Sequence, residues 1–128
     1  MEKTNIKSLY ERLGRAEGIS KLVEDIVDAH MRNPAIQARF IPLKDNSEHL
    51  EKVKKHTRQF LGAGSGGPET YEGQDMPVAH RGMNISETEY LHTIDDIMLS
   101  LDKNNIDQVS KNEVLAIAYS LKDQIVRL

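Results

Sequence analysis

One histidine stands in a sequence context that suits the binding of a metal-centred cofactor. His80 follows a loop that is rich in glycine between Gly62 and Gly73, and Pro68 rules out an ordinary helix through it. A small domain seldom keeps so long a loop without a function, because ordering it costs conformational entropy. The side chains near His80 are thioethers and aliphatic groups, namely Met76, Val78, Met83 and Ile85. An imidazole in such apolar surroundings suits a flat apolar cofactor with a central metal, which indicates heme.

Several dispersed motifs, in the same order along the chain, resemble the truncated (2-on-2) hemoglobins of group I. They span roughly residues 8 to 126 and comprise the run Leu9–Gly14, the helix end Arg32-Asn33-Pro34, Phe40, the GGP sequence, Tyr71, Gly73, Met76 and His80. The resemblance implies an all-α, globin-like domain over residues 1–128, in which two antiparallel helix pairs sandwich a heme. It also implies that His80 is the proximal iron ligand. Without it, His80 is simply an exposed loop histidine.

The distal side of the expected pocket departs from the family pattern. Val53, His56, Thr57 and Phe60 follow helical spacing and share one helix face. The resemblance places a distal tyrosine at Val27 and distal glutamines at Thr57 and Val53, and none of these residues is present. A pocket that holds oxygen through tyrosine and glutamine is therefore not expected.

Two histidines remain as distal candidates. His56 matches a position that supplies a sixth iron ligand in some cyanobacterial members; alternatively, it faces solvent within the basic run Lys54–Arg58. His30 lies one turn beyond Val27 on a predicted buried face. We favour a hydrogen-bonded core residue there, and the alternative is a side chain that reaches the distal cavity.

Further cofactor contacts follow from the same resemblance. Phe40 matches the phenylalanine that stacks on heme, with plain core packing as the alternative, and Tyr90 is expected at the cofactor's edge or back. Asp123 stands where some cyanobacterial members attach heme covalently through histidine, so we expect noncovalent heme b. The cations Lys52, Lys55 and Arg58 either pair with the heme propionates or solvate their helix.

Composition excludes several other classes of protein. The 128 residues carry a net charge of −3 with dispersed cations, which argues against a nucleic-acid partner. There is no cysteine, so a disulfide framework or thiolate metal site is impossible. No apolar run approaches the ~20 residues of a membrane span. The polar opening MEKTNIKS does not resemble a secretory signal, and we expect a cytoplasmic protein.

Apolar periodicity predicts helices on both sides of the loop. Before it, we expect a short helix over residues 6–13, a long one from Ile19 to Asn33, a tight turn over 35–40, and a helix to about Leu61 that opens with an Asp45–Glu48 capping box. After it, Ser86–Glu89 and Ser110–Glu113 have capping-box spacing. They open helices whose expected buried stripes are Tyr90, Leu91, Ile94, Ile97, Met98 and Leu101, and Val114, Ile117, Ala118, Leu121 and Ile125.

The resulting hypothesis is a heme globin that reversibly binds O2, NO or CO, with His56 and His80 both on the iron when no gas is bound. An enzymatic version is NO dioxygenation to nitrate, which requires an unidentified electron donor or reductase. The alternative is a bis-histidyl heme protein for electron transfer or redox sensing. A helical interaction module without cofactor would leave the loop unexplained.

Overall fold

A computed structural model describes residues 7–128, and this part of the chain is helical with one isolated β-bridge between Ile85 and Val126. The predicted fold class, all-α and globin-like, is confirmed. Expectations for the first six residues lie outside the described part. The helices are α1 (Leu9–Arg12), α2 (Arg15–Arg32), η2 (Gln37–Arg39), η3 (Ile41–Asp45), α3 (Ser47–Gly64), α4 (Met76–His80), α5 (Glu87–Lys103), α6 (Gln108–Ser120) and η4 (Lys122–Gln124).

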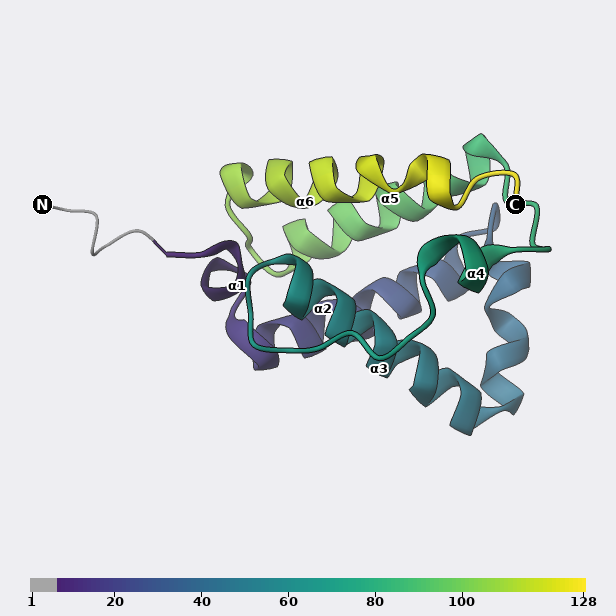
Figure 1. The fold of residues 1–128 in the computed structure, drawn as a ribbon, viewed down its shortest axis with the longest axis horizontal. Helices are drawn as coiled ribbons and strands as arrows, with labels where there is room; N and C mark the ends of the chain where they lie inside the picture. The colour runs from purple at the N-terminus through teal and green to yellow at the C-terminus, as the bar shows by residue number, and fades with distance from the viewer. Residues whose placement is uncertain (1–6) are drawn as a thin grey trace, which may run out of the picture.

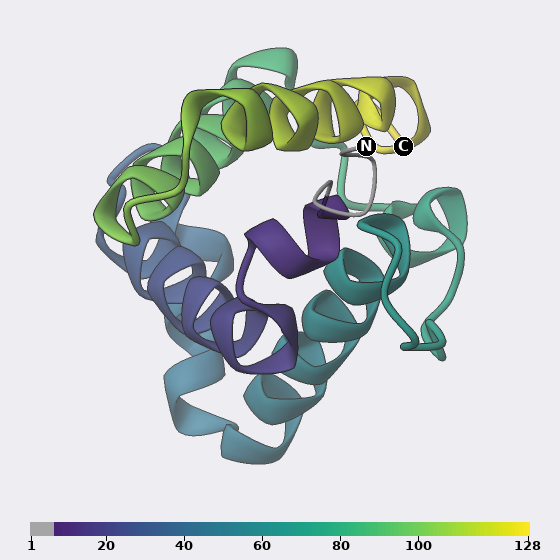
Figure 2. The same cartoon turned by 90° about the vertical axis from the view of Figure 1, so that its left-hand side faces the viewer.

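Four long helices form two pairs. Helix α2 packs against both α3 and α5, and α5 packs against α6. In Figure 1 the α5–α6 pair lies above the α2–α3 pair, and Figure 2 shows the same two layers end-on. The loop after α3 and the short helix α4 run along one side of this stack (Figure 2). In the described part of the chain, no helix has the length and apolarity needed to cross a membrane.

The predicted apolar stripe of α2 forms the centre of the core. Val23 is fully buried and Ile19 and Leu22 are nearly so, because the helical period brings them to one face. They join a first hydrophobic cluster with Leu9, Leu13, Val27, Leu101 and Val114. A second cluster, Tyr90, Ile94 and Ile125, lies at the α4 end of the molecule and is packed by Met76, Ile85, Met98, Ala118, Leu121 and Val126.

Helix boundaries test the predicted capping signals. The Ser86–Glu89 capping box is present at the start of α5. The other two capping boxes are wrong: Asn46 caps α3 through the His49 amide, and Asp107 caps α6 through the Ser110 amide. In both places another Asx residue, next to Asp45 or three residues before Ser110, offers its side-chain oxygen to the first free amides of the helix.

The prediction for one core residue is also wrong. Leu91 is 48% exposed, so the buried stripe of α5 runs through Tyr90 and Ile94 without it. Asp96 and Ser100 of the same helix are buried instead. Helix α5 therefore turns a partly polar face towards α2, which apolar periodicity alone does not reveal.

Gly14 illustrates why the α1–α2 corner requires glycine. Its φ of 97° lies in the left-handed region, and a Cβ at Gly14 would come within 2.9 Å of the Gly18 Cα. The close approach lets α1 fold back beside the start of α2. From there Tyr10 reaches the glycine loop, where its amide donates to Ser65 O at 2.9 Å and its hydroxyl donates to Glu69 Oε2 at 3.0 Å.

Candidate heme-binding site

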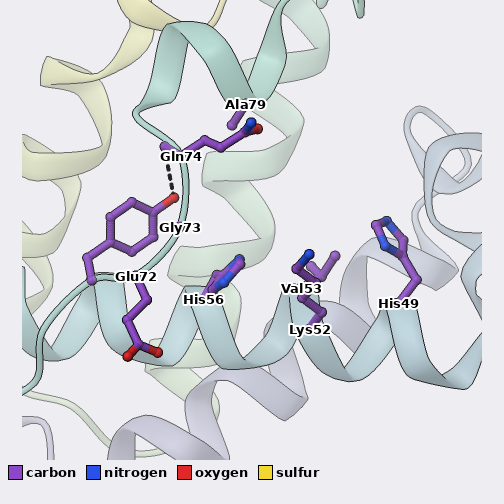
Figure 3. A pocket seen from close by; sticks show the side chains of 9 residues that line it. His49, Lys52, Val53, His56, Glu72, Gly73, Gln74 and Ala79 are labelled. Atoms are coloured by element: carbon purple, nitrogen blue, oxygen red, sulfur yellow. Dashed lines mark hydrogen bonds between the residues drawn. The ribbon is translucent and has the colours of Figure 1, made fainter.

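A cavity of about 470 Å³ lies between α3 and the segment that follows the glycine loop. His49, Lys52, Val53 and His56 line it from α3, and Tyr71, Glu72, Gly73, Gln74 and Ala79 line it from the loop and α4. Figure 3 shows the α3 side chains in a row beneath the loop, with Ala79 above them. Of the predicted site residues, the structure brings Val53, His56 and Tyr71 into this cavity.

Tyr71 is the lid of this cavity on the loop side. Its ring meets the His56 ring edge-on, with centroids 6.0 Å apart, and the Phe60 ring at 5.6 Å. Its hydroxyl donates to the Gln74 carbonyl at 2.6 Å (Figure 3). Burial raises the pKa of Tyr71, and the nearby Asp75 charge adds to this. Tyr71 therefore stays neutral and covers the two α3 rings.

A polar contact holds the loop onto α3 beside the lid. Gln59 Nε2 donates to Glu72 Oε1 at 2.8 Å, and the Glu72 amide donates back to Gln59 Oε1 at 3.0 Å. Hydrogen bonding from Gln59, together with the charge of Lys55, lowers the pKa of Glu72. Sequence reasoning missed this pair, because it joins residues of unremarkable type across a loop.

His80 lies at the end of α4 and is half-buried. Asp75 caps this short helix through the Val78 amide at 2.9 Å. The His80 Nδ1 atom lies 2.8 Å from the Met76 carbonyl oxygen. Because a carbonyl can only accept, Nδ1 is the donor in this contact, and Nε2 is the ring nitrogen that remains for a metal. Ala79, the neighbouring residue, lines the cavity that also contains His56.

His56 differs from His80 in what holds its ring. Among the hydrogen bonds between described residues none involves the His56 side chain, and its ring contact is with Tyr71. Thr57 is half-buried, but its hydroxyl donates to Val53 O at 2.8 Å. This part of α3 thus presents one imidazole without a hydrogen-bonding partner from the described residues.

His30 is buried, at 6% exposure, and its Nδ1 lies 2.7 Å from Asp96 Oδ2. Asn33 Nδ2 also donates to Asp96, at 3.1 and 3.2 Å to the two oxygens. Burial lowers the pKa of His30, and the Asp96 carboxylate opposes this only in part. The geometry agrees with the interpretation of His30 as a hydrogen-bonded core residue. The one sequence signal for Asp96 was its position beside the predicted buried stripe of α5.

The other predicted contacts do not line the cavity. Phe40 stacks on His30 with ring centroids 4.7 Å apart, and Val27 is buried in the first hydrophobic cluster. Met76, Ile85 and Tyr90 belong to the second cluster, where the Tyr90 hydroxyl donates to Ala118 O at 2.5 Å. The Met83 side chain is 39% exposed.

A model of the family "Bacterial-like globin" matches residues 8–127 of the chain. Two Tetrahymena proteins described as group 1 truncated hemoglobins are similar in sequence. The T. pyriformis protein is 24% identical over 120 residues, covering 93% of this chain and 95% of that protein. The T. thermophila protein is 29% identical over 76 residues, which are 59% of this chain and 63% of that protein.

Solved structures have the same fold. The Fe(III) form of the T. pyriformis truncated hemoglobin superposes with a TM-score of 0.86 at 20% identity, over 95% of this chain and all of that one. The 2/2 hemoglobin of Synechococcus sp. PCC 7002, with covalently attached heme, gives 0.79 at 23% identity over 92% and 95% of the two chains. The family match over residues 8–127 and the group 1 relatives confirm the resemblance: this chain belongs to the bacterial-like globin family of heme-binding proteins.

Proposed function

We propose that this globin holds heme b noncovalently through His80 Nε2 and binds O2, NO or CO at the iron. The observation that carries the proposal is the 2.8 Å contact from His80 Nδ1 to the Met76 carbonyl. A hydrogen bond at one ring nitrogen fixes the tautomer and orients the other nitrogen, as metal-binding histidines require. Bound heme supplies an iron that coordinates diatomic gases and changes oxidation state.

The surroundings of His80 fit a cofactor that is apolar in the middle and charged at its edge. The second hydrophobic cluster packs around Met76 and Ile85 on either side of His80. The cavity itself is bordered by the α3 residues Val53 and His56, and by Lys52. We assign Lys52, which lines the cavity, to a heme propionate. Lys55 and Arg58, further along α3, lie 3.5 Å from Glu72 and 3.8 Å from Glu51, and each would have to leave that carboxylate to bind a propionate.

We further propose that His56 binds the iron when no gas is present. The support is a half-buried imidazole that lines the cavity and has no hydrogen-bonding partner among the described residues. Val27 offers no hydrogen bond to a bound gas, so the distal side lacks a competing polar anchor. A gas must then displace His56, and its apparent affinity falls with the fraction of molecules in which the ring has left.

Noncovalent attachment is proposed although the Synechococcus structure carries a covalent heme. Asp123, at the position expected for the attaching histidine, is an exposed residue of η4. A carboxylate does not form the carbon–nitrogen bond that an imidazole forms.

The same His56 geometry favours a second candidate function. Two imidazole ligands keep the iron's coordination constant on reduction, which suits electron transfer or redox sensing. NO dioxygenation is the enzymatic variant of gas binding, and it additionally needs an electron donor. If CO binds to the reduced protein within milliseconds to seconds, gas chemistry is favoured. If CO fails to displace His56, electron transfer is favoured.

The experiment is a visible spectrum of the purified chain reconstituted with hemin, in both oxidation states and before and after CO. We expect a Soret band, and we expect His80→Ala to lose stable heme unless imidazole is added. His49→Ala is the matched control, because His49 lines the same cavity from an exposed position near the start of α3. An unchanged iron spectrum in His80→Ala would overturn the assignment of His80.

A further inference from the structure

Arg39, at the end of η2, makes three hydrogen bonds to Glu89 and Met83, in and before the first turn of α5. Its Nε donates to Glu89 Oε2 at 2.6 Å and its Nη2 donates to Glu89 Oε1 at 3.2 Å. The same Nη2 also donates to the Met83 carbonyl at 3.0 Å. The paired contact with the carboxylate fixes the plane of the guanidinium, as a single point charge such as lysine could not.

Glu89 is a rigid anchor for this guanidinium. It is the N3 residue of the capping box of α5, and its Oε1 accepts from the Ser86 amide at 3.0 Å. The Arg39 hydrogen bonds, with the Ser86 amide, lower the pKa of Glu89 to about 2. Glu89 therefore stays ionised, and the bridge stays closed, down to strongly acidic pH.

Through Met83 the bridge reaches the backbone of His80. The Met83 amide donates to the His80 carbonyl at 3.1 Å. Two further bonds hold this turn from the opposite side, because the amides of Gly82 and Asn84 donate to Leu128 O at 2.9 and 3.3 Å. Of the described side chains, Arg39 is the one that holds the Met83 carbonyl.

A surface ion pair by itself contributes only about 0–1 kcal/mol to stability. The Arg39 and Glu89 side chains are 30% and 26% exposed, so their bridge resembles the one between Arg12 and Glu113, at 25% and 42%. What distinguishes Arg39 is where its carbonyl lies, because Met83 belongs to the turn that follows His80. The Arg12 guanidinium instead bonds the Lys7 carbonyl at 3.2 Å and the Ser110 hydroxyl at 2.8 Å, at the α1–α6 contact.

We infer that Arg39 is a positioning residue for His80: by holding the Met83 carbonyl it sets the end of α4 and so the direction of the imidazole. The inference rests on the proposed role of His80 as iron ligand. The η2 segment then has two roles: Arg39 holds the turn after His80, and the next residue, Phe40, stacks on His30. Arg39 does not line the cavity, and it acts through Met83.

The test compares Arg39→Gln and Arg39→Lys with the matched control Arg12→Gln. All are made in a His56→Leu background, so that His80 is the one protein ligand to the ferrous iron. Resonance Raman spectroscopy should show a shifted and broadened iron–imidazole stretching band for Arg39→Gln, a smaller change for Arg39→Lys, and none for Arg12→Gln. Hemin transfer to an acceptor globin should be about tenfold faster in Arg39→Gln, equivalent to roughly 1.4 kcal/mol.

A second measurement needs no heme. Amide exchange of apo-protein should be several-fold faster at Met83 in Arg39→Gln than in the parent or in Arg12→Gln, because the Met83–His80 bond is then less constrained. Unchanged exchange at Met83 would overturn the inference, and so would faster exchange with an unchanged Raman band, which indicates a merely structural bridge. If the parent binds no hemin, the proposed function fails and the positioning role falls with it.

Discussion

The segment from Asp75 to Ile85 and the cavity face of α3 hold their histidines in opposite ways. His80 is bonded through its ring to Met76 O, and its carbonyl accepts from Met83, whose own carbonyl is held by Arg39. His56 lies on a long helix, and its ring contact is the edge of Tyr71.

For the proposed coordination, the difference predicts that His80 is the permanent ligand and His56 the displaceable one. A ring fixed at one nitrogen and on a tied backbone loses little further freedom when it binds iron. A ring held by one aromatic edge can enter or leave the cavity by rotation about its own side-chain bonds. We therefore expect the His80 ring to keep nearly the same position when a gas binds, and the His56 ring on α3 to move.

Heme removal should have the largest effect. A ligand at 1,000 times its dissociation constant adds about 4 kcal/mol to the free energy of unfolding, so apo-protein should unfold at a clearly lower midpoint. Amide exchange should rise most at Glu72, because Glu72 lines the cavity and its amide is bonded to the Gln59 side chain there. It should rise least at Gly82 and Asn84, which do not line the cavity and whose amides are bonded to the Leu128 carbonyl. Equal midpoints with and without heme would contradict a structural role for the cofactor.

The next largest effect should come from His56→Leu. We expect the ferric spectrum to change from low-spin to high-spin and CO binding to become at least about tenfold faster, because no ring must leave first. His30→Leu is the control and should leave the spin state unchanged, because the His30 ring is engaged by Asp96. The reverse result would identify His30 as the distal ligand.

A third prediction concerns the buried His30–Asp96 pair. Losing a hydrogen bond to a charged group costs about 1.5–3 kcal/mol, so His30→Leu should lower the free energy of unfolding by roughly 2 kcal/mol near neutral pH. His49→Leu, at an exposed position, should change it little.

The same pair should give a pH dependence. Burial lowers the pKa of His30 below its unfolded value, so the unfolded chain binds more protons as pH falls below about 6.5. The stability contributed by neutral His30 is thus present above that pH and lost below it. Urea unfolding of apo-protein measures this. The free energy of unfolding should fall less between pH 7.5 and pH 5.5 in His30→Leu than in the parent, and an equal fall in the two proteins would contradict the assignment.

The smallest effect is expected at Tyr71. Tyr71→Phe removes a hydroxyl bond to Gln74 O at an exposed site and should cost under about 1 kcal/mol. Tyr71→Leu also removes the edge contacts to His56 and Phe60, each worth about 0.5–1.5 kcal/mol. In the heme-bound protein, CO binding should therefore be slower in Tyr71→Leu, where the freed ring reaches the iron more often, than in Tyr71→Phe. Identical CO rates would mean that the lid does not restrain His56.

The amino-acid sequence determined the helices and the place of His80. Apolar periodicity and the Asn33-Pro34 pair are local signals, so the end and the buried stripe of α2 could be predicted. The glycines after Leu61 were a weaker signal, because α3 continues through Gly62 and ends at Gly64. The Ser86–Glu89 capping box is local in the same sense. The dispersed motifs around the loop led to the globin family, which the family match confirms.

The tertiary structure alone decided which polar side chains meet. Asp96 is hydrogen-bonded to His30, which is 66 residues away in the sequence, and Arg39 to Glu89, which is 50 residues away. Nothing within one helix distinguishes these partners from ordinary surface charges, because burial depends on the helix that packs against them. For the same reason Leu91 looked like a core residue and is exposed. Apolar periodicity predicts the buried face of a helix to within about one residue, whereas packing against neighbouring helices decides which residues of that face are buried.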